Sequence, residues 1–242
     1  MAKRGRKYRE ALERIDRERL YAPKAGFELL KDVDTAGYDS TVECSFRLGI
    51  DPRKADQMVR GAVGLPNGIG KSVRVAVVAS GDKVTEAKDA GADHAGGDEI
   101  VEALSDGSLI DEIDSVIATP DMMGKLGRLG KTLGPRGLMP NPKSGTVTMD
   151  VGKAVSEIKA GRVEYRSDRN GNVHTILGKA SFGVEQLVDN YSTLMDELIR
   201  QRPSAAKGRY VQTAAISTSN SPSIPLDPGK TGGGSAASDG EG

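Results

Sequence analysis

The pattern of apolar residues changes twice along this chain, near residue 68 and near residue 160. Before the first change the expected elements are helix, helix and strand, and after the second they are strand, strand, helix and strand. Between the two changes, short apolar strands alternate with helices, which is typical of a small sheet wrapped by helices. A chain that leaves one pattern and later returns to it is most simply explained as one discontinuous domain that contains an inserted one.

We therefore predict an α/β protein, in which an α+β split domain carries an inserted Rossmann-like βαβ domain. The split domain is expected to comprise residues 1–67 and 160–228, and the insert residues 68–159. The two chain crossings would form a two-stranded hinge between the domains, where glycine allows backbone motion. The glycines at these crossings are Gly68, Gly70 and Gly161. Residues 229–242 are rich in Gly, Ser and Ala and are expected to be disordered.

The strongest signals in the split domain are one strand and one helix. Apolar and polar side chains alternate over residues 41–48, which predicts a strand with one buried face. Apolar residues recur at helical spacing over residues 184–199, and Pro203 ends this pattern. The other elements expected here are helices over 9–20 and 23–33, a hairpin of strands 162–167 and 173–177 around Asn170-Gly171, and a last strand over 210–219.

The insert shows shorter elements of both kinds. Its expected strands cover residues 73–79 and 115–118, with at most a short strand within 91–96. Its expected helices cover residues 83–90, 98–104, 122–133 and 151–159.

Charge is unevenly distributed, although the formal net charge is zero. Residues 80–120 hold eleven acids and two bases, whereas residues 1–24 hold nine bases and four acids. Residues 121–143 hold five bases and one acid, and residues 200–210 hold four bases and no acid. Such a chain can present a basic face to a polyanion while carrying acid elsewhere. Solvated surface charge accounts for the same pattern, so charge alone leaves both interpretations open.

The single cysteine, Cys44, excludes a secreted scaffold held by internal disulfides and fits a reducing compartment. No apolar stretch follows the basic N-terminus, so no secretory signal is expected. The longest uninterrupted apolar run, residues 75–79, is far too short to cross a bilayer. We therefore expect a cytoplasmic protein without a membrane partner.

Residues 65–72, LPNGIGKS, resemble a phosphate-binding loop of the form Gly-x4-Gly-Lys-Ser/Thr. Leu65 occupies the position of the first glycine, and Gly64 lies one place too early. A phosphate-binding loop also opens a helix, whose N-terminal amides hold the phosphates, whereas the residues after Ser72 are expected to form a strand. The sequence thus disfavours nucleotide binding here. An enzyme that uses the insert for a small ligand remains the weaker alternative.

No cluster of His, Cys or carboxylate residues has the spacing of a metal site. The two histidines, His94 and His174, are far apart in sequence, and neither has an evident nucleophile or acid as a partner. We therefore expect no catalytic residue, no metal and no cofactor.

Residues 133–146 contain three prolines, three glycines, one Arg and one Lys, a composition that predicts a rigid, basic loop. Within and before it, residues 131–143, KTLGPRGLMPNPK, resemble the signature of the L-one family of ribosomal proteins. Further segments resemble that family in the same order: LGIDPR (48–53), VRG (59–61), LPNG (65–68), GAD (91–93), ATPD (118–121), GKASF (178–182) and ISTS (216–219). The resemblance extends from about residue 3 to residue 228.

This resemblance implies a non-enzymatic constituent of the large ribosomal subunit that binds a folded segment of large-subunit rRNA. It also implies a place on the mobile lateral stalk, which accompanies deacylated tRNA out of the exit site. Many bacterial members repress translation of their own operon mRNA. The expected partners are therefore large-subunit rRNA, exit-site tRNA and operon mRNA, bound by a monomer within the ribosome. A free translational repressor without a lasting ribosomal role would use the same RNA face, so that alternative stays open.

Carried over to this chain, the RNA face of the family lies mainly on the split domain. The residues that would form it are Tyr38, Thr41, Asp168, His174, Lys179, Thr213, Ser217, Thr218, Ser219, Asn220 and Ser221. Hydroxyls and amides suit 2′-OH groups and base edges, while Lys and Arg position phosphates. The family usually ends the last strand in Thr-Met-Gly, where this chain has Ser219-Asn220-Ser221, so a polar contact replaces an apolar one there.

Overall fold

The computed structural model describes residues 5–230, and all but the first two residues of the tail expected to be disordered, 229–242, lie outside this range. The chain divides into two compact units. The described part of the first consists of the residues up to Val59, Leu65–Gly70, and the residues from Tyr165 on. The second consists of Arg60–Gly64 and Lys71–Glu164. Helices and strands are mixed throughout, so the predicted α/β class is confirmed.

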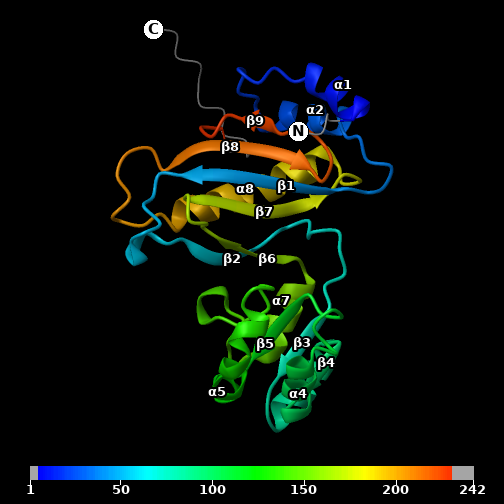
Figure 1. Ribbon diagram of the computed structural model, residues 1–242, viewed down its shortest axis with the longest axis vertical. Helices are drawn as coiled ribbons and strands as arrows, with labels where there is room; N and C mark the ends of the chain where they lie inside the picture. The colour runs from blue at the N-terminus through cyan, green and yellow to red at the C-terminus, as the bar shows by residue number, and fades with distance from the viewer. Residues whose placement is uncertain (1–4, 231–242) are drawn as a thin grey trace. The chain divides into compact units, whose positions relative to one another are not determined.

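The first unit is built on a four-stranded sheet with the order β7-β1-β8-β9 (Figure 1). Each strand is antiparallel to its neighbours. The strands are β1 (Thr41–Leu48), β7 (Asn172–Lys179), β8 (Val211–Thr218) and β9 (Ile224–Leu226). The central strand, β1, buries every second side chain, as its alternation predicts.

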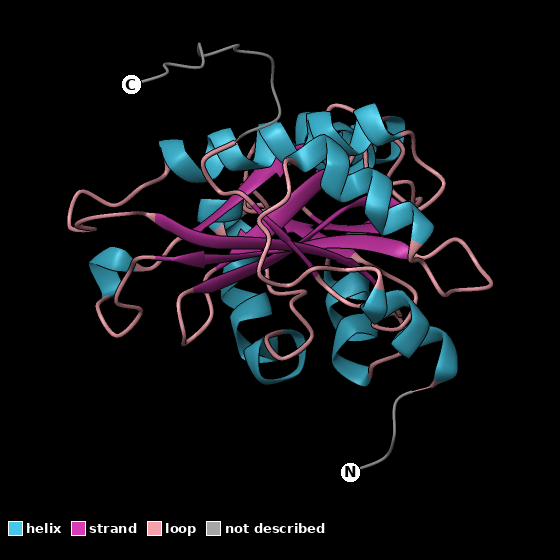
Figure 2. Cartoon of the chain, turned by 90° about the horizontal axis from the view of Figure 1, so that it is seen from above, coloured by secondary structure: helices cyan, strands magenta, loops and turns pink. Residues whose placement is uncertain are grey.

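Two helices, α2 (Pro23–Asp32) and α8 (Val184–Arg200), pack on one face of this sheet (Figure 2). The predicted apolar stripe of α8 faces the sheet, and Tyr191 at its middle is fully buried. The Tyr191 ring packs edge-on against Phe27 of α2, with centroids 6.1 Å apart, and stacks on Phe46 of β1 at 5.8 Å. These contacts join helix to sheet in a core that holds no Trp. A further helix, α1 (Arg6–Glu13), precedes α2.

The second unit holds a three-stranded parallel sheet of order β4-β3-β5. Its elements are β3 (Val75–Val78), α3 (Asp82–Asp89), β4 (His94–Gly96), α4 (Asp98–Asp106), β5 (Ser115–Ala118), α5 (Met123–Leu126), α6 (Gly130–Leu133) and α7 (Val151–Lys159). Ala76 and Val78 of β3 pack with residues of α4, α5 and α6, whereas Val75 and Val77 pack with α3 and α7. Helices on both faces explain why β3 is apolar throughout.

Two of the expected helices are shorter than the sequence indicates. The helix predicted over 9–20 ends at Glu13, and Leu20 is 56% exposed. The Asp16 carboxylate accepts the backbone N–H of Glu18, a local hydrogen bond that competes with helix. The helix predicted over 122–133 is divided into α5, α6 and two 3₁₀ turns, η2 (Pro120–Met122) and η3 (Gly127–Leu129). Three glycines in twelve residues weaken a continuous helix there.

Both strands predicted around Asn170-Gly171 form, but they pair with each other only through an isolated antiparallel bridge, Ser167–Val173. Gly171 has φ +78°, and a Cβ there would lie 3.2 Å from the Leu48 carbonyl oxygen, so the turn requires glycine. The strands on either side belong to different sheets, because β6 (Arg162–Arg166) pairs with β2 (Arg60–Gly64) while β7 joins β1. Neither β2 nor β9 was predicted. Pro225 in β9 is tolerated because β9 is an edge strand.

The segment Leu65–Gly70, where a hinge was predicted, is held against α8 of the same unit. Asn190, which is fully buried, accepts the backbone N–H of Asn67 at 3.1 Å and donates to the carbonyls of Gly68 at 3.0 Å and Leu177 at 2.7 Å. After Arg60–Gly64, the chain returns to the second unit at Lys71, directly after Gly70, and leaves it after Glu164, three residues past Gly161. Hinge motion at Gly68, Gly70 and Gly161 stays a prediction, and Gly68 is held by the hydrogen bond from Asn190.

The three hydrogen bonds of Asn190 lead to a stability prediction. Asn190→Ala leaves the N–H of Asn67 and the carbonyls of Gly68 and Leu177 without this partner, and the Leu177 bond is fully buried, so we expect the free energy of unfolding to fall by about 1–3 kcal/mol. Urea denaturation followed by circular dichroism would measure the change. Asn170→Ala serves as the control, because the Asn170 side chain is exposed and hydrogen-bonds to no described residue. Equal stability of the two variants would contradict a structural role for Asn190.

Candidate nucleic-acid interface

The sheet of the first unit turns one face toward α2 and α8 and leaves the side chains of the other at least partly accessible. We call the second face the open face. Because side chains alternate along a strand, the odd-numbered residues of β1 point to it. The register aligns rows across the open face: Lys179–Thr41, Ile176–Glu43–Ser217, His174–Ser45–Ala215 and Asn172–Arg47–Thr213. Five of the predicted RNA-binding residues therefore share one surface: Thr41, His174, Lys179, Thr213 and Ser217.

At one end of the open face a loop and a turn lie side by side. The loop, residues 34–40, leads into β1, and the turn, residues 218–221, follows β8. The Asn220 amide donates to the Tyr38 hydroxyl at 3.1 Å, and the Thr35 hydroxyl donates to the Asn220 carbonyl at 3.1 Å. Tyr38 is 60% exposed, so an aromatic ring is offered to solvent beside the hydroxyls of the strand ends.

Thr41 and Lys179 meet at this same end. The Lys179 ammonium donates to the Thr41 hydroxyl at 3.0 Å, so the cation is held at the rim of the face. Nearby, the Asp39 carboxylate accepts both the backbone N–H and the hydroxyl of Ser181 at 2.9 Å. The backbone N–H of Ser181 is the main reason that the pKa of Asp39 lies below its ordinary value. The loop is thus linked to the end of β7 as well as to the turn.

Thr218 differs from the other predicted residues, because its side chain points into the protein. It is 4% exposed, and its hydroxyl donates to Asp34 at 2.9 Å. Its neighbour Ser219 is exposed at the start of the turn. Ser221 closes the turn, where its hydroxyl accepts the backbone N–H of Thr218 at 2.8 Å. Thr218 and Ser221 therefore shape the end of the face, whereas Ser219 and Asn220 are presented on it.

At the other end of the sheet, Asp168 organises the turn before β7. Its carboxylate accepts the backbone N–H groups of Asn172 at 2.7 Å and Asn170 at 2.8 Å. These bonds hold the pKa of Asp168 below its ordinary value, and the bond from the Asn172 N–H has the largest effect. His174 lies 3.9 Å from the same carboxylate through Nε2, and its Nδ1 is 2.9 Å from the Ser45 hydroxyl. Asp168 thus fixes the turn, and His174 lies on the open face.

Six residues of these rows were not among the predicted ones: Glu43, Ser45, Arg47, Ile176, Asn172 and Ala215. The alternation in residues 41–48 already placed the first three opposite the core, so a signal for them was present. Ile176 is 38% exposed, and nothing in a single apolar residue of a strand distinguishes it. Glu43 is an exposed acid with no hydrogen bond or ion pair among the described residues, so it offers only acceptors to a ligand.

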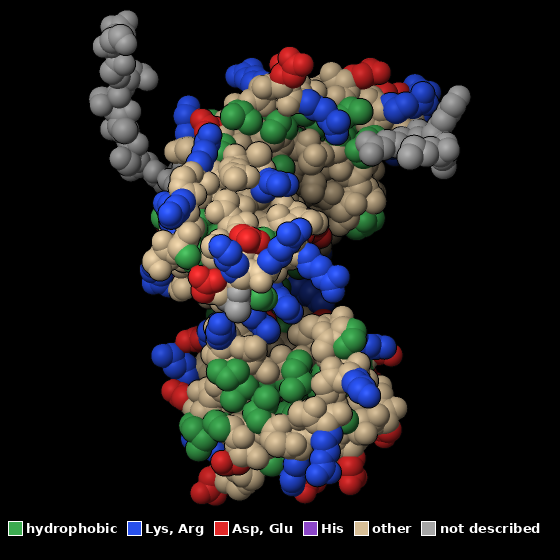
Figure 3. Space-filling view, turned by 60° about the vertical axis from the view of Figure 1, so that its left-hand side comes forward, with side chains coloured by type: hydrophobic (Ala, Val, Ile, Leu, Met, Phe, Trp, Pro, Cys, Tyr) green, Lys and Arg blue, Asp and Glu red, His purple; other side chains and the backbone are tan. Residues whose placement is uncertain are grey.

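Basic side chains gather where β1 ends and β7 and β8 begin. Backbone bonds from Leu48 to Gly171 and from Gly49 to Tyr210 bring these three segments together. The basic residues they carry, all exposed and without an ion pair within residues 5–230, are Arg47, Arg53, Lys54, Arg169, Lys207 and Arg209. Figure 3 shows Lys and Arg side chains crowding this side of the first unit. Such a cluster is an electrostatic attraction for a polyanion.

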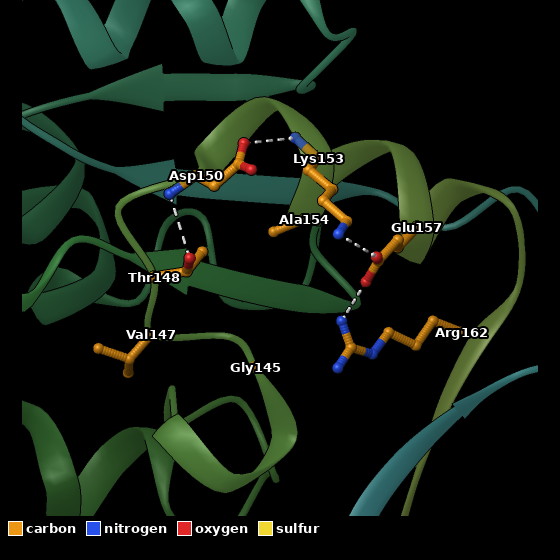
Figure 4. Close-up of a pocket in the computed structure, with 8 residues that line it drawn as sticks. All are labelled: Gly145, Val147, Thr148, Asp150, Lys153, Ala154, Glu157 and Arg162. Carbon is orange, nitrogen blue, oxygen red and sulfur yellow. Dashed lines mark hydrogen bonds and ion pairs between the residues drawn. The ribbon is translucent and has the colours of Figure 1, made fainter.

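The second unit has a cavity of about 290 Å³ beside the start of α7 (Figure 4). Lys153 and Arg162 reach into it, and both pair with Glu157. The carboxylate of Asp150 accepts the backbone N–H of Lys153 and so occupies the N-terminus of the helix. Since these charges already have partners inside the cavity, it lacks the free cation and free amides that an anion would need.

The loop that resembles a phosphate-binding loop does not have the required structure. Lys71 pairs with Asp114 at 2.6 Å, and the next element is the strand β3 rather than a helix. Within residues 5–230 no group of three or more His, Cys, Asp or Glu side chains could hold a metal ion. None of the described helices is long and apolar enough to cross a membrane.

The model of the family described as "Ribosomal protein L1p/L10e family" matches residues 30–222. Proteins called "Large ribosomal subunit protein uL1" are similar over nearly the whole chain. The one from Thermobifida fusca is 56% identical and covers 95% of this chain and 97% of its own. The one from Streptomyces avermitilis is 57% identical, over 96% and 95% respectively.

The Asp168 turn predicts a pH dependence of stability. Because the pKa of Asp168 is lowered in the folded chain, its contribution is present above the unfolded value, near 4, and is lost as the pH falls through the folded value. Asp168→Asn cannot titrate, so we expect the stability advantage of the wild type over this variant to shrink below about pH 4. Urea titrations across this range would test it. Asp189→Asn, at an exposed carboxylate on α8, is the control, and a constant advantage would refute the prediction.

Proposed function

The chain belongs to the ribosomal protein L1p/L10e family, and from this we propose that its first unit binds a folded segment of large-subunit rRNA through the open face. Membership makes the protein a structural constituent of the large ribosomal subunit and not an enzyme. Its place is the ribosome. The proposal concerns which surface of the chain holds the RNA.

One observation carries the proposal. Five polar residues, named from family resemblance and drawn from three strands far apart in sequence, project from one accessible sheet face. Next to them lie an exposed aromatic ring, Tyr38, and an exposed amide, Asn220. Hydroxyls, amides and an aromatic ring suit 2′-OH groups, base edges and unstacked bases of folded RNA. The basic cluster at the far end of the sheet would position phosphates, which strengthens binding without reading sequence.

The same chemistry extends the proposal to two further RNAs. Exit-site tRNA would meet the basic cluster, whose cations form no ion pair with any described residue, while the stalk carries the tRNA away. The protein's own operon mRNA would occupy the open face, provided that it presents the fold found in the rRNA segment. Since one face would serve both rRNA and mRNA, the two must compete for it. Crosslinking in cells followed by sequencing of the bound RNA would identify all three partners.

The assignment of the open face leads to a prediction about RNA affinity. Thr41→Val and Ser219→Ala should each weaken binding to the isolated rRNA segment about tenfold, because an RNA group left unpaired costs roughly 1–3 kcal/mol and ~1.4 kcal/mol is a factor of ten. Filter binding at one fixed salt concentration would measure this. Lys131→Ala, at an exposed lysine of the second unit without a described partner, should leave the affinity unchanged. If Lys131→Ala weakened RNA binding strongly and neither Thr41→Val nor Ser219→Ala changed the affinity, the RNA face would lie on the second unit.

A shortened chain tests whether the second unit contributes to binding of the rRNA segment. Replacing residues 71–159 by a short linker keeps Leu65–Gly70 with its Asn190 contacts and keeps both β2 and β6. We expect this shortened chain to fold and to retain most of its affinity for the rRNA segment. Circular dichroism and filter binding would show both, and Thr41→Val in the shortened chain should again reduce affinity. A soluble, folded product that has lost most of its affinity would contradict the assignment to the first unit.

A further inference from the structure

The loop 34–40 and the turn 218–221 are joined by side chains beyond the point where the sheet ends. The last paired residues of β1 and β8 are Val42 and Thr218. Past this pair, no backbone hydrogen bond within residues 5–230 links the loop to the turn. The groups that the proposed function offers to RNA here, Tyr38 and Asn220, therefore depend on side-chain contacts for their relative position.

Asp34 makes the most extensive of these contacts. Its carboxylate accepts the Ser40 hydroxyl at 2.7 Å, the Thr218 hydroxyl at 2.9 Å and the backbone N–H of Ala36 at 3.1 Å. Ser40 is fully buried and Thr218 is nearly so, so both hydroxyls are directed inward at the carboxylate. Asp34 thus ties both ends of its own loop to the end of β8.

The position of this acid is unusual for a surface that binds a polyanion. Asp34 forms no ion pair with any described residue, and an uncompensated carboxylate beside phosphates weakens their binding. Its two oxygens are instead occupied by three donors from the protein, and such charge-assisted bonds are the stronger kind. The negative charge of Asp34 is therefore stabilised by hydrogen bonds within this junction and not by a neighbouring cation.

We propose that Asp34 is a positioning residue of the RNA interface, which sets the distance between Tyr38 and Asn220 before RNA arrives. A loop and turn already held in the binding geometry lose less conformational freedom on binding. The Asn220–Tyr38 and Thr35–Asn220 hydrogen bonds lie on the exposed side of the same junction and depend on it. The inference rests on the proposed function, because it assigns a role within that interface.

The sign of the effect distinguishes positioning from simple electrostatics. Asp34→Ala removes one negative charge near RNA, which by charge alone should tighten binding. Positioning predicts the opposite, a loss of affinity of about tenfold or more, equal to ~1.4 kcal/mol. Asp32→Ala is the matched control: the same charge is removed two residues earlier, from an exposed carboxylate that forms no hydrogen bond or ion pair among the described residues. It should bind as well as the wild type or slightly better.

A conservative variant tests whether geometry or charge matters. In Asp34→Asn, the amide oxygen can still accept from Thr218 and Ala36, and the amide nitrogen can donate to the Ser40 oxygen. We expect Asp34→Asn to recover most of the affinity that Asp34→Ala loses. Hydrogen exchange on the free, full-length protein gives a readout independent of RNA. In Asp34→Ala the amides of both the loop and the turn should exchange faster, while those of β7 stay protected.

The probe is a transcript of the large-subunit rRNA segment that crosslinks to the wild-type protein, in filter binding at fixed salt. Thr218→Val removes the hydroxyl on the other side of the contact, and it replaces Asp34→Ala if that variant is too unstable. If both variants fold, the double variant should bind no more weakly than either single one. Unchanged or tighter binding by Asp34→Ala, or equal losses in Asp34→Ala and Asp34→Asn, would overturn the inference alone. A wild type without specific affinity for the transcript would overturn the proposed function as well.

Discussion

The pairing of β1 with β7 and β8 is the constraint on which the rest of the structure depends. It joins residues 41–48 to two strands that lie more than a hundred residues later in the chain. Loop-closure entropy grows only slowly with loop length, so a long intervening segment is thermodynamically tolerable. The inserted unit can therefore interrupt the chain without breaking the sheet. With the pairing in place, α8 and α2 have a surface to cover, and the open face contains residues from all three strands.

The open face is accessible because α2 and α8 pack on the other face of the sheet. A sheet with helices on one side only must carry polar residues on the other, and β1, β7 and β8 all alternate in that manner. What distinguishes this face from ordinary solvated surface is the composition of its rim. Hydrogen bonds among Tyr38, Asn220, Thr41 and Lys179 hold several exposed polar groups in fixed positions. Fixed polar groups can discriminate between RNA shapes, whereas mobile ones mainly add affinity.

Elements with a strong period were predictable from sequence, and those held by tertiary contacts were not. Residues 41–48 and 184–199 carry clear periods of two and 3.6, and both are correct. By contrast, β9 contains Pro225 and forms only because an exposed sheet edge is available. The orientation of Thr218 is also predictable from the sequence. Ala214, Ile216 and Thr218 are alternate residues of β8, so their side chains point to the same side, and the two apolar ones indicate that this side is the core. The contacts of Asp34 could not be inferred, since its partners are scattered along the chain.

The zero net charge of the chain conceals two different uses of its basic residues. In the second unit several bases, among them Lys125, Arg136 and Lys83, pair with Asp98, Asp111 and Glu86, so much of its positive charge is neutralised within the unit, although Lys131 has no ion pair with any described residue. At the end of the four-stranded sheet, exposed bases such as Arg53 and Arg169 have no such partners among the described residues. A cation that binds a polyanion releases counterions from it. A cation that is already in an ion pair must first break that pair, whereas an unpaired cation need not. Under the proposed function, this unpaired cluster attracts RNA to the unit that carries the open face, although the net charge of the whole sequence is zero.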